Sequence, residues 1–301
     1  MKREDGACGM RQDPQIGESL EAFIRGLKSS QGLDIATYDE SFLHTSIRKR
    51  VLEIGLRDIA DYAAYLMENR AEAAGFYHSL SVGHSDFFRN QFAFAVLEQR
   101  ILPALIAQKK QTGHGEIRVW SAGCAAGQEA WSVAMLLEEL TGGEEPAVPY
   151  RIFATDRSAP ELAVARSGIY SAAAVGNVRT RHLRDYFSQH GESFEVVARL
   201  RERVDFSGYD LLDEGSACPD ASIYGDFDLI LCCNLLFYYR AEIRQQILGK
   251  LCRALAPGGY CVTGEVERDN VTPQYGLRPI TTPTAVFHKP KTTRLPISHV
   301  P

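Results

Sequence analysis

A loop of small residues lies between an apolar run and a helical pattern, and such a loop can hold a ligand against its backbone. The apolar run covers residues 117–122, the loop covers residues 123–127 (Gly-Cys-Ala-Ala-Gly), and Gln128 and Glu129 open the helix. Glycine here allows a bound group to approach the main chain closely. The loop is not G-x-G-x-x-G and has no Lys-Ser/Thr pair of a P-loop, so taken alone it equally fits a turn that the fold requires.

A carboxylate stands where the next apolar run ends. Asp156 follows Ala154 and Thr155 directly. An acidic side chain at the carboxyl edge of a sheet can accept hydrogen bonds from both hydroxyls of a ribose. The alternative is that Asp156 caps the N-terminus of the following helix, which is a common use of Asp.

A third apolar run, residues 227–233, is followed by polar and aromatic side chains. Asn234, Tyr238 and Tyr239 come after it. If this run is a strand parallel to the first, Asn234 and Tyr238 face the same crevice. Either tyrosine also fits a role in packing alone.

Further upstream, a polar segment precedes an amphipathic stretch that begins at Phe87. Ser85 or Asp86 could cap the helix that follows, and Arg89 could bind a carboxylate with two parallel hydrogen bonds. An arginine on the protein surface is the alternative for Arg89.

The elements that must position these residues alternate between strand and helix. Strand-like runs cover residues 117–122, 150–155, 227–233 and 260–263, and helical patterns cover residues 129–140 and 241–255 between them. Alternating strands and helices predict an α/β domain with a mostly parallel, doubly wound sheet. Before it, apolar residues recur at helical spacing from residue 18 to residue 81, which predicts a small helical domain.

We therefore predict five segments. They are a disordered leader at 1–17, a helical domain at 18–85, a linking helix at 86–115, an α/β domain at 116–289 and a tail at 290–301. Within the α/β domain, residues 178–187 read as a helix and residues 193–206 as two short strands. These elements predict a small β-subdomain inserted at about 175–206.

The composition limits the classes of partner and compartment. With 33 basic and 38 acidic residues the net charge is −5, so no overall field attracts nucleic acid or an anionic membrane. The seven cysteines are odd in number and include no C-x-x-C pair, which argues against a zinc site or a disulfide framework. There is no secretory signal and no apolar stretch long enough to span a membrane, so we expect a cytoplasmic protein.

Taken together, the motifs resemble one family. F-F-R at 87–89, W-S-A-G-C-x-x-G-x-E at 120–129, A-T-D at 154–156, F-D-L-I-x-C-x-N-x-x-x-Y at 227–238 and G-G-Y at 258–260 occur in this order. The chain resembles the chemotaxis receptor methyltransferases from Tyr38 to Lys289. The resemblance implies a Rossmann-like methyltransferase fold with an N-terminal helical domain and an inserted β-subdomain, serving chemotaxis and signal transduction.

The resemblance also implies a reaction and a site. The expected activity is transfer of a methyl group from S-adenosyl-L-methionine to glutamate carboxylates of receptors, giving methyl esters and S-adenosyl-L-homocysteine. Two residues, Arg89 and Tyr238, are implied at the reacting groups, and no metal is expected. The implied cofactor-binding residues are Gly83, Ser85, Arg89, Ala122, Gly123, Glu129, Asp156, Asp210, Leu211, Asn234 and Leu235.

The partners implied by the resemblance are the helices of a receptor signalling domain. The basic residues Arg48, Lys49, Arg50 and Arg57 become a docking face for an acidic helical bundle, or else an ordinary solvated face. The β-subdomain could bind a peptide at the receptor's C-terminus. Neither nucleic acid nor direct membrane insertion is expected.

At several positions, Gly83, Asp210 and Cys233 among them, the chain departs from the family pattern. Gly83 and Asp210 each stand where Asn is usual, and Cys233 stands where Arg is usual. Two alternatives follow: a methyltransferase-like module that binds S-adenosylmethionine as a scaffold or sensor, and a methyltransferase of the same fold that acts on a small molecule or RNA. The acidic balance argues against RNA, and the helical domain favours a protein substrate.

Overall fold

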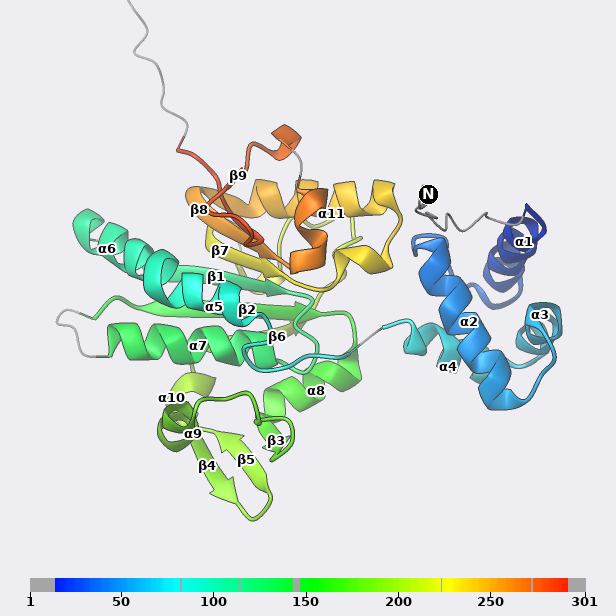
Figure 1. Cartoon of the computed structure of the whole chain (residues 1–301), viewed down its shortest axis with the longest axis horizontal. Coiled ribbons are helices and arrows are strands. Elements are labelled where there is room, and N and C mark those ends of the chain that lie inside the picture. Colours follow the sequence, from blue (N-terminus) through cyan, green and yellow to red (C-terminus); the bar gives the residue numbers. More distant parts are fainter. Residues whose placement is uncertain are drawn as a thin grey trace, which may run out of the picture. The chain divides into compact units, whose positions relative to one another are not determined.

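The computed structural model describes residues 14–81, 83–113, 115–142, 147–222, 224–271 and 273–291, which form two compact units (Figure 1). The helical unit consists of residues up to Ser81 together with Tyr238–Arg240, and the α/β unit contains the rest of the chain. The first helix begins at Pro14, so residues 14–17 of the expected leader are helical and that boundary was wrong. Residues 1–13 of the expected leader lie outside the described residues.

The helical unit is built from helices with polar N-caps. Asp39, Asp58 and Asn69 each accept a hydrogen bond from a main-chain N–H in the first turn of the helix that follows. Such caps satisfy donors that have no partner within the helix, and each is worth about 1 kcal/mol. The helices are α1 (Pro14–Gln31), α2 (Glu40–Ile54), α3 (Ile59–Glu68) and α4 (Arg70–Ser79).

Three aromatic rings form the centre of this unit. Phe23 stacks on Tyr62 with ring centroids 6.1 Å apart, and the edge of Phe76 packs against both at 5.9 and 5.8 Å. Leu43 and Ile47 of α2 are fully buried as well. Burial of each such side chain contributes roughly 1.5 to 3 kcal/mol, so the apolar periodicity of the sequence specifies a packed core.

A short segment from late in the chain completes the helical unit. The main-chain N–H of Asp39 donates to the Tyr238 carbonyl at 2.8 Å, and the N–H of Arg240 donates to the Thr37 carbonyl at 3.0 Å. The rings of Tyr38 and Tyr239 stack 5.4 Å apart. Residues 238–240 are therefore held by main-chain hydrogen bonds as well as by ring packing.

The α/β unit contains, among the described residues, a seven-stranded sheet in the order β6-β2-β1-β7-β8-β10-β9. The first five strands of this order are parallel to their neighbours, and β10 and β9 are antiparallel. The strands are β1 (Ile117–Ala122), β2 (Tyr150–Asp156), β6 (Val204–Gly208), β7 (Phe227–Cys232), β8 (Leu255–Thr263), β9 (Arg278–Pro279) and β10 (Val286–His288). The prediction of a doubly wound, mostly parallel sheet is confirmed.

Helices cover both faces of this sheet, with α7 and α11 on opposite sides of the strands in Figure 1. Every residue of β7 is buried, as expected of a central parallel strand. The helices are α5 (Gln91–Val96), the π-helical turn η1 (Leu97–Ile101), α6 (Leu102–Thr112), α7 (Gln128–Thr141), α8 (Ala159–Ser167), α9 (Thr180–Tyr186), α10 (Ala198–Arg201) and α11 (Ala241–Ala254). The expected linking helix thus begins at Gln91 and contains a π turn.

Short stretches of 3-10 helix are η2 (Asp220–Ser222), η3 (Leu236–Tyr238), η4 (Glu265–Asn270) and η5 (Pro273–Tyr275), and of their residues only Tyr238 belongs to the helical unit. Among the described residues, no helix is both long and apolar enough to cross a membrane.

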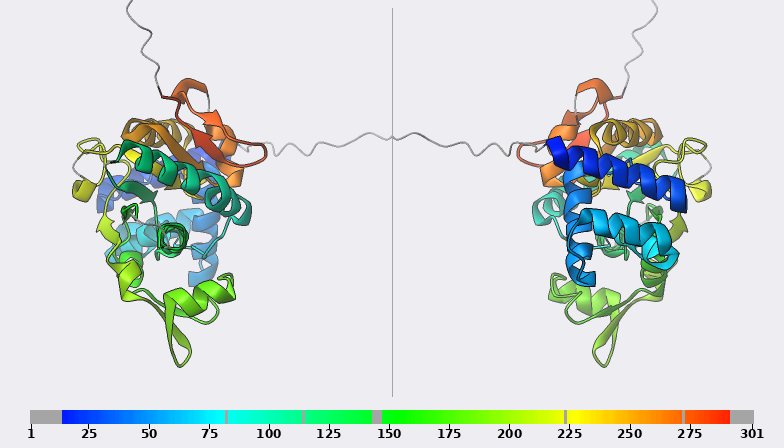
Figure 2. Two further views of the ribbon diagram at one scale, coloured as in Figure 1. Left: turned by 90° about the vertical axis from the view of Figure 1, so that its left-hand side faces the viewer. Right: turned by 90° about the vertical axis from the view of Figure 1, so that its right-hand side faces the viewer.

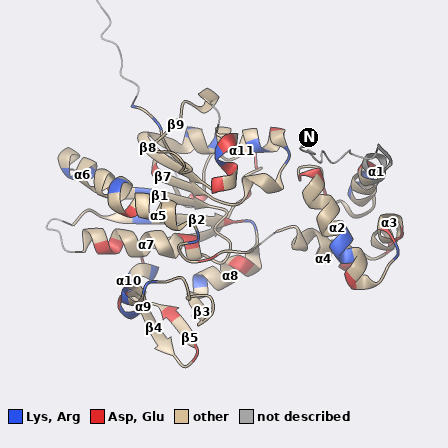
Figure 3. Ribbon diagram, viewed as in Figure 1, with Lys and Arg blue, Asp and Glu red and all other residues tan. Residues whose placement is uncertain are grey.

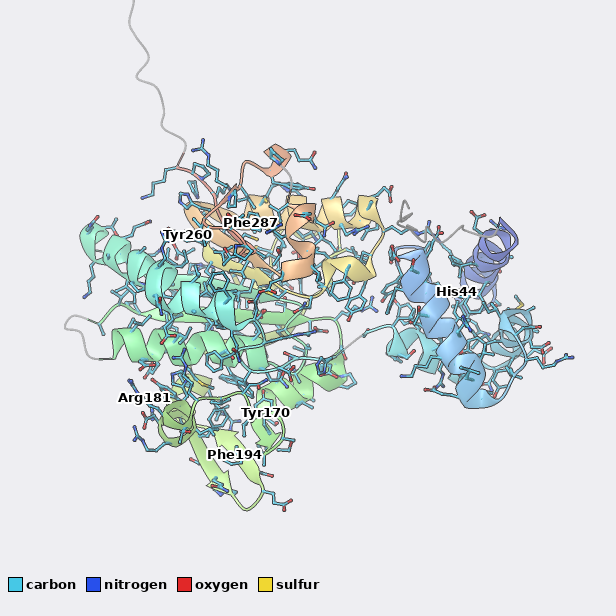
Figure 4. All side chains as sticks on the ribbon, in the orientation of Figure 1. His44, Tyr170, Arg181, Phe194, Tyr260 and Phe287 are labelled. Carbon is cyan, nitrogen blue, oxygen red and sulfur yellow. The ribbon has the colours of Figure 1, made fainter. Side chains whose placement is uncertain are left out.

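A second, three-stranded sheet of order β3-β5-β4 is present, formed by β3 (Ile169–Ser171), β4 (Phe187–His190) and β5 (Ser193–Val196). Tyr170 and Phe194, labelled in Figure 4, are paired across β3 and β5. The β4–β5 hairpin projects from the rest of the α/β unit in both views of Figure 2. A small β-subdomain is therefore present near the expected place.

Its predicted membership was partly wrong. Residues 204–206 were expected within the subdomain, but they belong to β6, which pairs in parallel with β2 at the edge of the main sheet. The ring of Phe206 lies 5.1 Å from that of Trp131 on α7, so burial against α7 draws this strand to the main sheet. The small sheet begins earlier than predicted, at Ile169.

Candidate functional site

A pocket lies at the carboxyl ends of β1, β2 and β7. The chain leaves β1 toward β2 on one side, whereas β7 lies on the other side of β1, so this edge is the point where the strand order reverses. Crevices at such points are the usual ligand sites of doubly wound sheets. The pocket is lined by His84, Ser85, Asp86, Arg89, Asn90, Ala93, Phe94, Leu97, Gly123, Ala125, Glu129, Asp156, Leu231, Cys233, Asn234, Leu235 and Val262.

The loop after β1 forms one wall. The N–H groups of Gly123 and Cys124 both donate to the Thr155 carbonyl, at 2.8 and 2.9 Å, which fixes the loop to the end of β2. Gly123 has φ +81°, and a Cβ there would lie 3.1 Å from a methyl carbon of Leu235 across the pocket. Gly127 has φ +90° and lies so close to Ala165 that a Cβ would stand 2.9 Å from that side chain. Both glycines are therefore favoured by their conformation, and Gly127 is favoured by the lack of space as well.

Asp156 organises the same loop from the end of β2. One carboxylate oxygen accepts from the Ala125 N–H at 2.9 Å, and the other accepts from the Ser158 N–H at 2.8 Å. The N-cap of α8 is Ser158, so Asp156 is not the cap. A carboxylate has about four acceptor positions, and each oxygen of Asp156 thus retains one for a ligand in the pocket.

Glu129 in the first turn of α7 is a second carboxylate of the pocket. The Ser121 hydroxyl donates to it at 2.7 Å. Burial raises the pKa of the Glu129 carboxyl, the negative charge of Glu267 adds to the rise, and the Ser121 hydrogen bond, the Cys233 thiol and the Arg89 charge oppose it. A cationic group bound here would relieve the cost of burying this charge.

Arg89 lies at the exposed side of the pocket. Its guanidinium donates to the His84 carbonyl at 3.0 Å. The preceding residue, Phe88, is buried, has φ +51°, and donates its N–H to the Ser132 hydroxyl of α7 at 3.1 Å. Packing of Phe88 therefore anchors the turn that presents Arg89.

Behind the pocket, a fully buried carboxylate shapes the loop that follows β7. Glu267 accepts from the main-chain N–H groups of Asn234 at 2.9 Å and of Leu236 at 2.6 Å, with further donors from Gly264 at 2.8 Å and Phe237 at 3.4 Å. Asn234 has φ +58°, an unusual conformation for a residue other than glycine. The bonds to Glu267 hold it there, and so place Asn234 and Leu235 in the pocket wall.

Comparison with known proteins agrees with this geometry. The family profile described as "CheR methyltransferase, SAM binding domain" matches residues 83–280, and "CheR methyltransferase, all-alpha domain" matches residues 18–81. The chain belongs to the CheR methyltransferase family. It is an S-adenosylmethionine-dependent methyltransferase, and the resemblance seen in its motifs is confirmed.

Similar proteins align over most of the chain. Chemotaxis protein methyltransferase 1 of Pseudomonas aeruginosa is 29% identical over 261 residues, which cover 85% of this chain and 92% of that protein. The chemotaxis protein methyltransferase of Listeria monocytogenes is 28% identical over 264 residues, covering 88% and 95% of the two chains. That of Escherichia coli is 30% identical over 242 residues, covering 78% and 79%.

The pocket of this CheR-family protein fits S-adenosylmethionine in its donor and acceptor groups. The open acceptor positions of Asp156 suit a ribose diol, and the buried Glu129 suits the ammonium of the methionine portion. Gly123 leaves the wall opposite Leu235 free of a side chain. When bound, S-adenosylmethionine supplies an electrophilic methyl carbon attached to a positively charged sulfur.

Seven of the predicted site residues meet in this pocket, as the sequence led us to expect: Ser85, Arg89, Gly123, Glu129, Asp156, Asn234 and Leu235. Gly83, Ala122, Asp210 and Leu211 are not among the described residues that line it. Ala122 is fully buried within β1, and a Cβ at Gly83 would overlap the carboxylate of Glu161. Tyr238 belongs to the helical unit, where its ring lies 4.8 Å from that of Phe42.

Other lining residues were not predicted as site residues. Ala125 could have been inferred, because it lies within the small-residue loop that already drew attention. The apolar wall made by Ala93, Phe94 and Leu97 comes from α5 and η1, and its helical spacing marks only a buried face. Glu267 was not predicted either, because its sequence position carries no signal that it binds the loop after β7.

Proposed function

We propose that this methyltransferase esterifies glutamate side chains of chemotaxis receptors, using the pocket at the carboxyl ends of β1, β2 and β7. The observation that carries the proposal is the meeting of Asp156, Glu129 and Arg89 in one pocket. Two carboxylates there suit a cofactor that has a ribose diol and an ammonium, and a guanidinium suits an incoming carboxylate. Acting on receptor signalling domains, the enzyme would work in the cytoplasm.

Each residue has a distinct part in the proposal. Asp156 accepts the ribose hydroxyls and Glu129 binds the ammonium group. Asp210 and Leu211 follow β6, the strand beside β2, and contribute the adenine end. The walls of the pocket are completed or supported by Gly83, Ser85, Ala122, Asn234 and Leu235. Arg89 orients the substrate carboxylate, and a role of Tyr238 at the reacting groups stays a prediction from the resemblance.

No general base is required of this chain. Glutamate has an ordinary pKa of about 4.3, so the attacking carboxylate is already ionised near pH 7. The task of Arg89 and of the pocket walls is to align an oxygen with the methyl carbon and to exclude water. Such positioning can contribute roughly 7 to 11 kcal/mol to lowering the barrier.

The proposed reaction predicts a characteristic product. Incubation with radiolabelled S-adenosylmethionine and receptor signalling domain should label the receptor, and base should release the label as volatile methanol, because carboxyl methyl esters hydrolyse in base. The same assay with receptor that lacks its C-terminal peptide tests whether the β-subdomain, with its edge strands β3 and β4, binds that peptide.

The outcomes separate the alternatives. Calorimetric binding of S-adenosylmethionine without labelled receptor would favour the scaffold or sensor. Label that resists base would indicate a different acceptor group, and label on RNA or a small molecule would replace the receptor proposal.

The docking face that we propose on the helical unit contains fewer residues than the basic cluster predicted from the sequence. Arg50 is held by Glu72 in a two-bond ion pair at 2.8 and 2.9 Å, and the Tyr62 hydroxyl donates to the same carboxylate. Arg57 pairs with Asp61 at 2.9 Å. Arg48 and Lys49 are exposed on α2, part of whose ribbon is coloured as basic in Figure 3, and Lys49 keeps only a long contact of 3.9 Å with Glu53. We therefore assign receptor docking to Arg48 and Lys49, and a structural role to Arg50.

Reversing the charge at this face should weaken receptor methylation. For Arg48→Glu we expect kcat/KM for the receptor to fall about tenfold at low salt, and the loss to shrink as salt is added, because exposed charges are screened. Arg25→Glu on α1 is the matched control, since Arg25 is an exposed arginine on another helix. Equal loss in both variants, or a change in S-adenosylmethionine affinity, would contradict the assignment.

A further inference from the structure

A buried lysine of α11 reaches the loop that follows β6. Lys250 is only 7% exposed. Its ammonium donates to the Asp213 carbonyl and to the Tyr209 hydroxyl, the latter at 3.3 Å, and lies 5.2 Å from the centre of the Tyr209 ring. A buried ammonium is costly unless it is hydrogen-bonded, so these contacts are specific. Lys250 thus joins α11 to residues 209–216, which we call the β6 loop.

The β6 loop is in turn fixed to the end of β2. The Tyr209 N–H donates to the Asp156 carbonyl at 3.1 Å, and Gly208 pairs with Asp156 in the sheet. The Tyr209 hydroxyl donates to the Ser216 carbonyl at 3.0 Å and closes the loop. Asp210 accepts from the Leu212 N–H at 2.9 Å within a tight turn. The position of Asp210 relative to Asp156 therefore depends on how Tyr209 is held.

The charges of the loop favour the same arrangement. Burial lowers the pKa of Lys250, whereas the negative charges of Asp213 and Asp210 oppose that effect and Arg253 adds to it. Lys250 is thus the buried cation that offsets an acidic loop. Without it, the carboxylates of the loop would repel one another and the loop would lose its anchor on α11.

We propose that Lys250 is a positioning residue for the adenine end of the cofactor site. It does not line the pocket, and it acts by holding the β6 loop, and so Asp210 and Leu211, beside Asp156. The inference rests on the proposed function, in which those two residues contribute the adenine end.

The test is the variant Lys250→Met, which keeps the length of the side chain and removes its ammonium. We expect the KM for S-adenosylmethionine to rise about tenfold, with kcat and the KM for receptor within about twofold of the parent. Methylthioadenosine, which carries adenine and ribose but no amino acid, should lose inhibitory strength by the same factor.

Lys289→Met is the matched control. Lys289 is also partly buried, and its ammonium donates to the carbonyls of Cys252 and Leu255 at 2.7 and 2.6 Å, away from the β6 loop. It should lower the melting temperature and leave the KM for S-adenosylmethionine unchanged. Lys250→Arg, which keeps the cation, should restore most of the affinity that Met loses.

Two results would overturn the inference. One is a folded Lys250→Met protein with unchanged KM, and the other is an equal KM change in Lys289→Met. If Lys250→Met does not fold, Tyr209→Phe takes its place: loss of the hydroxyl should raise the KM about threefold, and no change would refute the tether. Calorimetry measures the affinity of the same variants for S-adenosylmethionine even if no receptor is methylated. Failure of the proposed function can therefore be distinguished from failure of this inference.

Discussion

Replacing Asp156 by Asn should raise the dissociation constant for S-adenosylmethionine about 100-fold or more. The variant loses the charge and one acceptor oxygen that the ribose diol requires, and hydrogen bonds to charged groups are worth roughly 1.5 to 3 kcal/mol each. The new amide NH2 must also face the N–H of either Ala125 or Ser158, both of which Asp156 now accepts. Isothermal titration calorimetry measures the loss directly.

The control for this prediction is Asp205→Asn on the neighbouring strand. Asp205 pairs with Arg151 at 3.3 Å, with both side chains partly exposed, and such a pair contributes little. We expect its affinity for S-adenosylmethionine to match the parent. Undiminished affinity in Asp156→Asn would remove Asp156 from the site and with it the assignment of the pocket.

Replacing Glu267 by Gln should lower the free energy of unfolding by about 3 kcal/mol or more, because an NH2 group would face two main-chain N–H donors that now have an acceptor. Each carboxylate oxygen of Glu267 accepts from two N–H groups, so either orientation of the amide leaves two of them without a partner. Thermal melting should show a decrease of roughly 6 °C or more.

The same variant should also weaken cofactor binding, since Asn234 and Leu235 are placed by these bonds. Glu265→Gln is the matched control, because Glu265 is exposed in the same 3-10 turn and its change should leave stability and affinity near those of the parent. If Glu267→Gln melts like Glu265→Gln, then the buried carboxylate does not hold the loop after β7 and the account of that wall fails.

These two carboxylates show how the fold prepares a reaction that needs no proton transfer from the enzyme. Asp156 holds the loop after β1 and Glu267 holds the loop after β7, and both loops are fixed by main-chain N–H groups before any ligand enters. A site fixed in this way spends little binding energy on ordering its own walls. The alignment of the reacting groups can then depend on Arg89, as proposed.

Much of the site could be predicted from sequence because of one property of parallel sheets. The carboxyl ends of neighbouring parallel strands lie at one edge, so a residue placed just after a strand is placed at that edge. Gly123, Asp156 and Asn234 each follow an apolar run, and they meet in the pocket. The helical domain could also be predicted from the sequence, because polar caps and apolar periodicity are local properties of the chain.

What the sequence by itself determined was therefore the order of elements and the residues at their ends, both of which local pattern encodes. Only the tertiary structure decided that β6 joins the main sheet, that Glu267 accepts from Asn234 across 33 residues of chain, and that Lys250 reaches Asp213 across 37. It likewise decided that Arg50 forms an ion pair with Glu72 within the helical unit. These contacts form between segments that are distant in the sequence and that pack together in the fold. A buried charge must be hydrogen-bonded or paired, and only the packed fold determines which groups lie close enough to do so.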